Sequence, residues 1–213
     1  MVAVVSPAVG HLAKGEDGRR RCPWGDSTPE YVAYHDEEWG RPVTDDRGIY
    51  ERLVLEGFQS GLSWLTILRK RAGFREAFAN FDIETVARFG KRDVGRLLGD
   101  AAIVRHRGKI EAAIANAKAA TALDVGLAEL VWSHAPSGRR RAPRALGDVP
   151  ATTPESVALS KELKRRGFRF VGPTTTYAAM QACGIVNDHI AGCWVRAEVE
   201  RERSTAILTS RDG

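Results

Sequence analysis

Apolar residues recur with a helical period along most of this chain, from residue 28 to about residue 200. No segment shows a convincing alternation of apolar and polar residues, the pattern of a half-buried strand. The alanine-rich stretch at 105–123 is typical of a long helix, because alanine has the highest helix propensity. Shorter segments at 82–90 and 91–100 also favour helices. The sequence therefore predicts an all-α protein.

The two ends of the chain differ in composition from the middle. Residues 1–21 open with a short apolar run that a proline and a glycine interrupt, and no basic region precedes it. This pattern does not indicate a secretory signal, and we expect a flexible N-terminal leader. Residues 196–213 are highly charged and predict a flexible C-terminal tail. One folded domain is expected at 22–195, with a connecting loop at about 133–153, where prolines and arginines cluster.

Composition limits the location and the partners. The chain has 32 Lys and Arg against 27 Asp and Glu, and its net charge of +5 favours an anionic partner such as nucleic acid without proving one. No stretch approaches the roughly 20 apolar residues of a membrane span. The number of cysteines is three, which is odd and argues against a disulfide framework. We expect a cytoplasmic protein with no membrane partner.

Four residues near the ends of the predicted domain have metal-binding chemistry: Cys22, His35, His189 and Cys193. His189 and Cys193 are four positions apart, and on a helix both side chains would lie on one face. Two cysteines and two histidines suit a tetrahedral zinc ion, and a site with four protein ligands would be closed and structural. The alternative is that these residues only pack in the core, as we expect for Cys183.

A basic helix, a short turn and a second helix follow one another at about 159–184. Gly167 ends the first helix, and Gly172 precedes the second, whose first turn contains Thr174. The unpaired backbone amides of that turn would attract an anion. This arrangement is a helix-hairpin-helix, which can hold a DNA phosphate without reading sequence, and its basic residues are Lys161, Lys164, Arg165, Arg166 and Arg169. The alternative is an ordinary helical corner with a solvated basic face.

Glu56 lies near the end of a predicted apolar helix at 45–61 and is close in sequence to Trp64. Tyr31, Tyr34 and Trp39 add aromatic area within residues 31–40. A carboxylate among aromatic rings suits a flat, cationic ligand, because the ring faces and the negative group both attract it. The alternative is that the aromatic residues belong to the core and Glu56 only caps its helix.

Eight short motifs occur in order along the chain: CPWG, YVAYHDEEWG, EGFQSGLSW, ILRKR, RHRGKI, LKRRGFRFVGPTTTY, MQACGIVNDH and AGC. Together they closely resemble the DNA-3-methyladenine glycosylase I (Tag) family, and the resemblance runs from Cys22 to about Trp194. It implies the all-helical fold of the helix-hairpin-helix glycosylases, with one structural zinc ion joining the N- and C-terminal segments. It also implies an enzyme that flips 3-methyladenine out of alkylated double-stranded DNA and hydrolyses its N-glycosidic bond, leaving an abasic site.

The resemblance also assigns roles to residues at matching positions. The zinc ligands would be Cys22, His35, His189 and Cys193. Glu56 would be the catalytic carboxylate that hydrogen-bonds the damaged base, and the residues around that base would be Tyr34, Trp64, Tyr31 and Trp39. The residues that meet the DNA would be Gly61 and Leu62 at the gap in the duplex and Gly167, Gly172, Thr174, Lys164 and Arg165 along its backbone.

Several details of the activity stay open. Phe58 stands where many family members have glutamine, a change that could alter the cavity rim or shift the lesion preference. Asp188 lies where many relatives in the wider superfamily have a catalytic aspartate, but the resemblance to this family argues against that role. No lysine is placed as an imine-forming nucleophile, so we expect a monofunctional enzyme that leaves the strand intact. The sequence says nothing of the oligomeric state, and we expect a monomer because that is the commonest case. A protein that binds damaged DNA without releasing a base is the alternative.

Overall fold

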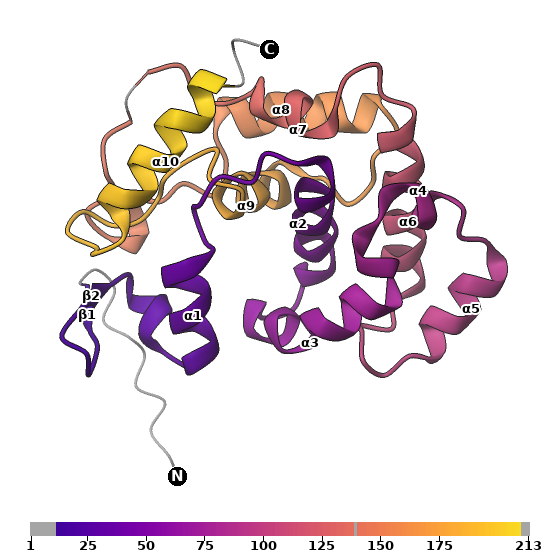
Figure 1. Ribbon diagram of the computed structural model, residues 1–213, viewed down its shortest axis with the longest axis horizontal. Coiled ribbons are helices and arrows are strands. Elements are labelled where there is room, and N and C mark those ends of the chain that lie inside the picture. Colours follow the sequence, from indigo (N-terminus) through magenta and orange to yellow (C-terminus); the bar gives the residue numbers. More distant parts are fainter. Residues whose placement is uncertain (1–11, 139, 210–213) are drawn as a thin grey trace.

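The computed structural model describes residues 12–138 and 140–209, and within these ranges it is almost entirely helical (Figure 1). The α-helices are α1 (Pro29–Glu37), α2 (Asp46–Gln59), α3 (Trp64–Ala77), α4 (Ile83–Ala87), α5 (Lys91–Gly99), α6 (Arg107–Thr121), α7 (Leu127–Trp132), α8 (Pro154–Arg165), α9 (Pro173–Ala182) and α10 (Arg196–Thr209). The 3₁₀ helices are η1 (Pro23–Asp26), η2 (Ala79–Phe81) and η3 (Leu146–Asp148). A small antiparallel pair, β1 (Ala13–Lys14) and β2 (Arg20–Arg21), precedes them. Apart from that pair, the predicted all-α class is confirmed.

Capping residues fix where several helices begin. Thr28 is the N-cap of α1, with Pro29 in the first turn, and its side chain accepts a hydrogen bond from the Tyr31 backbone N–H. Asp45 and Ser63 cap α2 and α3 in the same way. Each cap satisfies a backbone N–H that has no partner within its helix. The sequence therefore sets these boundaries locally.

The main apolar core is built around α2, which packs against α6, α7 and α9. Ile49, Tyr50 and Leu53 of α2 are buried in it. The Tyr50 hydroxyl donates a hydrogen bond of 2.9 Å to the Ala113 carbonyl of α6, so its polar atom is satisfied inside the core. Figure 1 shows α4, α5 and α6 on one side of the molecule and α1 with the strand pair on the other. The core thus fixes α2 between the two sides.

Phe58 belongs to this core and not to a cavity rim. Its side chain is 1% exposed, and its ring centroid lies 4.7 Å from that of Phe74 and 6.0 Å from that of Phe78. A side chain enclosed in this way cannot meet a ligand at the surface. The prediction that Phe58 alters the rim is therefore wrong, because the residue faces inward from α2.

Helices α8 and α9 form the predicted helix-hairpin-helix. Gly167 ends the first helix with a φ of +95°, which favours glycine, and Gly172 is the N-cap of α9. The Ser160 hydroxyl of α8 donates to the Val171 carbonyl of the turn. Asn116 of α6 bonds the backbone of the same turn through both its amide atoms. These contacts hold the hairpin firmly against the core.

Both ends of the described chain are more ordered than the sequence predicted. Arg196–Thr209 form α10, where we expected a flexible tail, and Val199 and Arg203 of this helix are buried. Residues 12–21 contribute the strand pair and bury Arg21, where we expected a flexible leader. These segments are mostly charged, so the sequence did not reveal the few side chains that point inward and anchor them. The rest of the predicted leader and tail, residues 1–11 and 210–213, lies outside the described residues.

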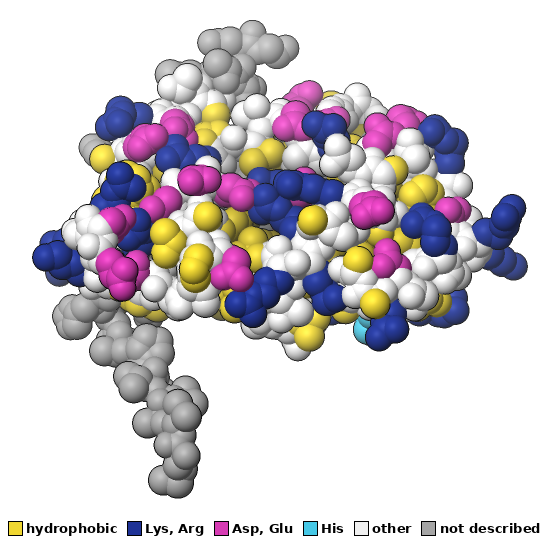
Figure 2. All heavy atoms as spheres, turned by 60° about the horizontal axis from the view of Figure 1, so that its bottom comes forward, with side chains coloured by type: hydrophobic (Ala, Val, Ile, Leu, Met, Phe, Trp, Pro, Cys, Tyr) yellow, Lys and Arg dark blue, Asp and Glu magenta, His cyan; other side chains and the backbone are white. Residues whose placement is uncertain are grey.

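The surface carries charges of both signs. Figure 2 shows Lys and Arg side chains interspersed with Asp and Glu across one face of the molecule. On α8, Arg165 and Arg166 both pair with Glu162, which lowers the net positive charge beside the hairpin. None of the helices in the described ranges is long and apolar enough to cross a membrane. Because acidic and basic side chains are mixed on the face shown in Figure 2, the net positive charge of the chain does not by itself indicate a DNA-binding surface there.

Candidate active site and metal centre

A cavity of about 230 Å³ opens between α1, α2, α3 and α9, and we call it the aromatic cavity. Its walls are Trp24, Tyr31, Tyr34, Trp39, Glu56, Trp64, Ala178 and Gln181. Every residue that the sequence analysis expected around a base is among them. The structure therefore brings Glu56 together with the four predicted aromatic residues in one enclosure.

The walls come from two parts of the molecule. The N-terminal segment supplies Trp24 from η1, Tyr31 and Tyr34 from α1, and Trp39 just after α1. The remaining wall residues belong to α2, α3 and α9, which pack in or against the main core. The aromatic cavity therefore lies between the N-terminal segment and the main core.

The rings of the cavity stand close to one another. The ring centroids of Tyr34 and Trp64, which come from opposite parts, are 5.4 Å apart with the planes tilted by 45°. Trp24 meets Tyr31 and Trp39 edge-on, at centroid distances of 5.6 and 5.0 Å. The Leu65 backbone N–H donates to the Tyr31 hydroxyl, which ties α1 to the start of α3. This packing holds rigid apolar faces around a space of limited size.

Glu56 is the buried carboxyl group of the cavity. Its side chain is almost inaccessible, and burial raises its pKa from the ordinary value of 4.5 to about 8, although Arg52 opposes the shift. The neutral acid is therefore favoured in the empty cavity at neutral pH. A cation placed beside it would favour the carboxylate instead. The site thus offers its negative charge mainly to a positively charged ligand.

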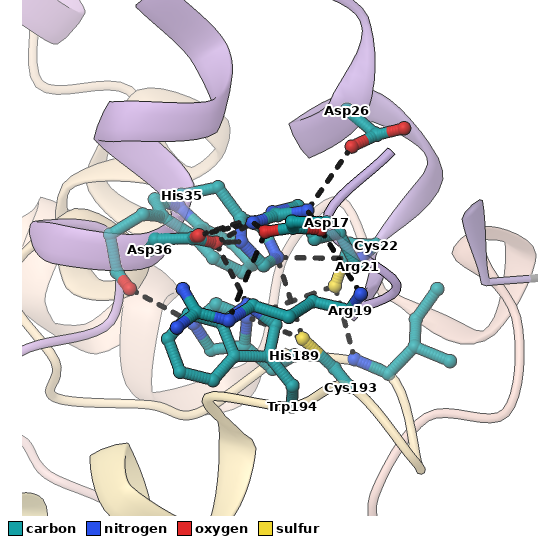
Figure 3. A network of polar contacts seen from close by, with 12 residues as sticks. Asp17, Arg19, Arg21, Cys22, Asp26, His35, Asp36, His189, Cys193 and Trp194 are labelled. Carbon is teal, nitrogen blue, oxygen red and sulfur yellow. Dashed lines mark hydrogen bonds and ion pairs between the residues drawn. The ribbon is translucent and has the colours of Figure 1, made fainter. Parts of the chain in front are cut away.

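Cys22, His35, His189 and Cys193 converge on one point, and we call them the Cys–His cluster (Figure 3). All four are buried, and their ligand atoms lie within 4.8 Å of one another. The Cys193 sulfur is 3.5 Å from Nε2 of His35 and 3.6 Å from Nδ1 of His189, and the Cys22 sulfur is 3.7 Å from the latter. A tetrahedral zinc ion holds neighbouring sulfur and nitrogen ligands about 3.5 Å apart, given bonds of about 2.3 and 2.0 Å. The donor set and its spacing fit zinc.

The second ring nitrogen of each histidine is fixed by a further acceptor. Nδ1 of His35 donates to the Asp36 carboxylate at 2.8 Å, and Nε2 of His189 donates to the Trp39 carbonyl at 2.9 Å. These bonds leave Nε2 of His35 and Nδ1 of His189 as the lone pairs that face the cluster. Burial lowers the pKa of His189, which favours the neutral ring that binds metal. Such outer partners are typical of histidine ligands to zinc.

Arg21 holds the outer carboxylate in place, as Figure 3 shows. Its guanidinium donates to both oxygens of Asp36, with the shortest distance 2.7 Å, and also pairs with Asp17 at 2.6 Å. Trp194, the residue after Cys193, donates a further hydrogen bond of 3.1 Å to Asp36. The short N-terminal strand pair therefore supports the geometry of His35.

His189 and Cys193 do not lie on a helix, contrary to the sequence prediction. They belong to the segment between α9 and α10, in a turn where the Cys193 N–H donates to the Ile190 carbonyl. Gly192 in this turn has a φ of +87°. A tight turn that includes a left-handed glycine brings the two side chains together instead. Cys183 is a buried core residue outside the cluster, as predicted.

Comparison with known proteins decides the family. The model of the methyladenine glycosylase family matches residues 24–197. The DNA-3-methyladenine glycosylase 1 of Escherichia coli (strain K12) is 48% identical over 179 residues, which cover 81% of this chain and 95% of that protein. The chain belongs to the methyladenine glycosylase family. It is therefore a DNA glycosylase by descent.

Solved structures of family members share the fold. A crystal structure of a 3-methyladenine DNA glycosylase I (TAG) is 48% identical, has a TM-score of 0.79, and covers 82% of this chain and 98% of that chain. The TAG from Staphylococcus aureus, for which the structural basis of 3-methyladenine recognition has been described, is 33% identical with a TM-score of 0.78, covering 83% and 96% of the two chains. The helical architecture described above is that of methyladenine glycosylases.

The DNA-contact residues expected from the family lie at two exposed turns. Gly61 has a φ of +82° in the turn between α2 and α3, and the Leu62 side chain beside it is 38% exposed. At the hairpin, Gly167, Lys164, Arg165 and Thr174 are all exposed, and Gly172 is half-buried. Arg165 is partly neutralised by Glu162. Both turns are accessible to a partner, and their contact with DNA stays a prediction.

Asp188, the position of the catalytic aspartate in wider relatives, is enclosed by partners. It is 5% exposed, and one oxygen accepts hydrogen bonds from the Tyr177 hydroxyl and the Gln181 side-chain amide. Arg140 lies 3.8 Å from its other oxygen. It does not line the aromatic cavity. The sequence analysis argued against a catalytic role for Asp188 without excluding it, and that expectation stays a prediction.

Three wall residues were missed by sequence reasoning: Trp24, Ala178 and Gln181. Trp24 and Gln181 stand in the motifs CPWG and MQACGIVNDH, which contributed to the family resemblance without a role being assigned to them. Membership in these motifs was the available signal for Trp24 and Gln181. Ala178 carried no such signal.

Proposed function

We propose that this methyladenine glycosylase flips 3-methyladenine out of alkylated double-stranded DNA and hydrolyses its N-glycosidic bond, leaving an abasic site. The observation that carries the proposal is the buried carboxyl group of Glu56 at the wall of the aromatic cavity. A methyl group on N3 makes adenine a flat cation, and aromatic faces with an adjacent carboxylate attract such a ligand. The relatives named above carry the same activity in their names.

The chemistry needs little from the protein beyond binding and positioning. The positive charge of the alkylated base already weakens its glycosidic bond, so the leaving group needs no strong acid. Flipping costs a few kcal/mol and costs least for a damaged base, which itself favours the lesion. Glu56 becomes ionised as the cation arrives and stabilises it. Water then attacks the anomeric carbon through an oxocarbenium-like state.

Strand cleavage by an imine mechanism is not expected. Such a mechanism needs an unpaired lysine at the reacting sugar, and the described walls of the aromatic cavity contain none. Lys109, which lies near the end of α2, donates to the Phe58 and Ser60 carbonyls and thereby fixes that end of the helix. The enzyme is therefore proposed to be monofunctional.

The Cys–His cluster is proposed to hold one structural zinc ion. All four coordination positions would be protein atoms, so the ion would have no open position for catalysis. Its contribution would be to join the N-terminal segment, through Cys22 and His35, to the segment before α10, through His189 and Cys193. None of the three cysteines forms a disulfide, which suits the cytoplasmic location expected from the sequence.

Contacts with DNA are proposed at the two exposed turns. Gly61 and Leu62 would enter the gap that the flipped nucleotide leaves, since Leu62 presents apolar area at a turn beside the aromatic cavity. The hairpin with Gly167, Gly172 and Thr174 would meet a phosphate through backbone amides, assisted by Lys164 and Arg165. One protein molecule would suffice for these contacts, and we propose a monomer.

A base-release assay tests the function. The purified protein is incubated with methylated duplex DNA, and the freed bases are identified by chromatography. We expect release of 3-methyladenine, with 7-methylguanine left in place. Glu56→Gln should lower the rate about 10- to 100-fold, the scale of one hydrogen bond to a charged group. Glu84→Gln on the exposed face of α4 is the matched control and should not change the rate.

The competing function is binding of damaged DNA without chemistry. A protein of that kind would release no base, and its DNA affinity would be insensitive to Glu56→Gln. Equal release of 3-methyladenine by the wild type and by Glu56→Gln would contradict the assignment of Glu56, although the enzyme class would stand.

A further inference from the structure

Gln181 of α9 lines the aromatic cavity, and its amide group is held in one orientation. Its Nε2 atom donates a hydrogen bond of 2.9 Å to an oxygen of Asp188. The same Asp188 oxygen also accepts from the Tyr177 hydroxyl, so the Gln181 amide presents its N–H to an atom that acts as an acceptor. The carbonyl oxygen of Gln181 is then the acceptor that is left over.

Asp188 is well placed to enforce that orientation. It is buried and receives a second hydrogen bond, of 2.5 Å, from the Tyr177 hydroxyl on the same oxygen. Arg140 donates to the Tyr177 hydroxyl and lies 3.8 Å from the other Asp188 oxygen. Donors therefore surround Asp188, and a rotated Gln181 amide would place oxygen against oxygen.

The Gln181 carbonyl oxygen has no hydrogen-bond partner within the part of the chain that the structure describes. It is also absent from the fully buried polar atoms that lack a partner there, so it retains some accessible surface. Gln181 and Glu56 both line the aromatic cavity, and each carries a side-chain oxygen that can accept a hydrogen bond. Unlike the Glu56 carboxyl, the amide oxygen does not change with pH.

We propose that Gln181 is a specificity-determining residue, which accepts a hydrogen bond from the amino group at C6 of a methylated adenine and repels the oxygen at C6 of a methylated guanine. Asp188 is the positioning residue that fixes its amide. The inference rests on the proposed function and deepens it, because it names which feature of the base is read.

The chemistry of the two purines explains the selectivity. The adenine amino group has two N–H bonds, which suits two acceptors. Guanine carries a carbonyl oxygen at the same position, and its lone pairs would face the oxygens of Glu56 and Gln181 without a hydrogen between them. Leaving polar groups unpaired in an enclosed site is a strong basis for rejection. Methylation at N3 or at N7 of guanine does not remove this conflict.

Gln181→Met tests the proposal, since methionine keeps the length and shape of the side chain and removes the amide. The release of 3-methyladenine, 3-methylguanine and 7-methylguanine is measured for both proteins. We expect the preference for 3-methyladenine over either guanine to fall at least about tenfold, the scale of one buried hydrogen bond. Slower release of all three bases in equal proportion would show a merely structural role and would overturn the proposal.

A second pair of variants keeps the test valid if methionine disturbs the fold. Gln181→Glu places a carboxylate against Asp188 and should release 3-methyladenine poorly. Adding Asp188→Asn restores a donor–acceptor pair with reversed polarity while an oxygen stays at position 181. The double variant should recover at least about tenfold of the loss. A double variant no better than Gln181→Glu alone would contradict the inference.

Binding of the free base separates this inference from the proposed function. The affinity of free 3-methyladenine for the wild type and for Gln181→Met is measured by calorimetry, with thermal melting as a check on folding. If the wild type releases no base yet binds 3-methyladenine, and Gln181→Met binds it at least about tenfold more weakly, the proposed function fails and the role of Gln181 stands. Equal affinities overturn the role of Gln181 whatever the outcome of the release assay.

Discussion

The main core and the Cys–His cluster hold the chain together by different means. The main core is a continuous set of buried aliphatic and aromatic side chains that joins most of the helices. The cluster lies in a second, much smaller apolar group, which has five buried members among the residues that the structure describes, two of them Cys22 and Cys193 themselves. Apolar burial is therefore sufficient in one region, whereas the other depends on its polar groups and a proposed metal ion.

The comparison matters because the aromatic cavity lies between the two regions. Glu56, Trp64 and Gln181 lie on helices that pack in or against the main core. Tyr31 and Tyr34 lie on α1, and His35, the residue after Tyr34, belongs to the Cys–His cluster. Metal binding would therefore position one wall of the cavity, and core packing would position the other. The central claim is that the proposed zinc ion would support the active site by a structural role alone.

The largest effect is expected from removing a ligand of the cluster. Cys193→Ala should abolish binding of the single zinc ion and lower the free energy of unfolding by an amount on the order of 10 kcal/mol at most, the scale of structural zinc sites. Metal content and thermal melting measure the two effects. Cys183→Ala is the control, a buried cysteine of the main core that should retain one zinc per chain. A stable, metal-free wild type would refute the zinc assignment.

A cavity made in the main core should lower stability without affecting zinc binding. Leu97 of α5 is fully buried and distant in sequence from every cluster residue. Leu97→Ala should lower the free energy of unfolding by about 2–5 kcal/mol because it leaves a void. Zinc affinity should be unchanged, as measured by chelator competition. A parallel loss of zinc affinity would mean that the two regions are one cooperative unit.

Stability should depend on pH through Glu56, which lies where the two regions meet. Burial raises its pKa from 4.5 to about 8, so in the folded protein Glu56 keeps a proton that the unfolded chain releases. Between these two values the contribution of Glu56 to stability falls as pH rises. The free energy of unfolding of Glu56→Gln should therefore gain on the wild type by up to about 1.4 kcal/mol per pH unit in this window. Denaturant titrations at pH 5, 6 and 7 measure the difference, and a constant difference would contradict the raised pKa.

The smallest effect is expected from the outer support of the cluster. Arg21→Met removes the hydrogen bonds that hold Asp36 against His35 and leaves all four ligands in place. Zinc affinity should fall about 10- to 100-fold, the usual effect of losing an outer partner. Arg107→Met, an exposed arginine on α6, is the control. Unchanged affinity in Arg21→Met would limit the strand pair to a packing role.

Sequence reasoning succeeded where the signal is local. The alanine-rich segment predicted α6, Thr28 and Pro29 predicted the start of α1, and the glycines predicted the hairpin. The residues themselves suggested that Glu56 and the aromatic side chains share a ligand cavity, and the family resemblance assigned their roles. Sequence reasoning failed where contacts between distant segments determine whether a segment folds or which way a side chain points. The fold of α10 depends on a few inward positions such as Val199, and the placement of Phe58 depends on which face of α2 meets Phe74.

The role of Gln181 illustrates the same limit. A glutamine in an apolar helix gives no hint of its direction, and only the enclosed Asp188 fixes its amide. The turn that joins His189 to Cys193 was likewise mistaken for a helix, since a spacing of four suits both. Contacts with residues elsewhere in the fold determine the orientation of Gln181 and the conformation of the His189–Cys193 segment. The spacing of residues along the chain does not reveal these contacts.

The most direct test of the central claim is hydrogen exchange of the zinc-loaded protein before and after chelation. The account predicts faster exchange in residues 13–40 and 187–199, which carry the cluster and one cavity wall, with α4, α5 and α6 unchanged. Affinity for free 3-methyladenine should fall in the chelated sample. Unchanged exchange around the cluster, or equal acceleration in α4 to α6, would contradict the claim that the metal supports one wall of the active site while the main core supports the other.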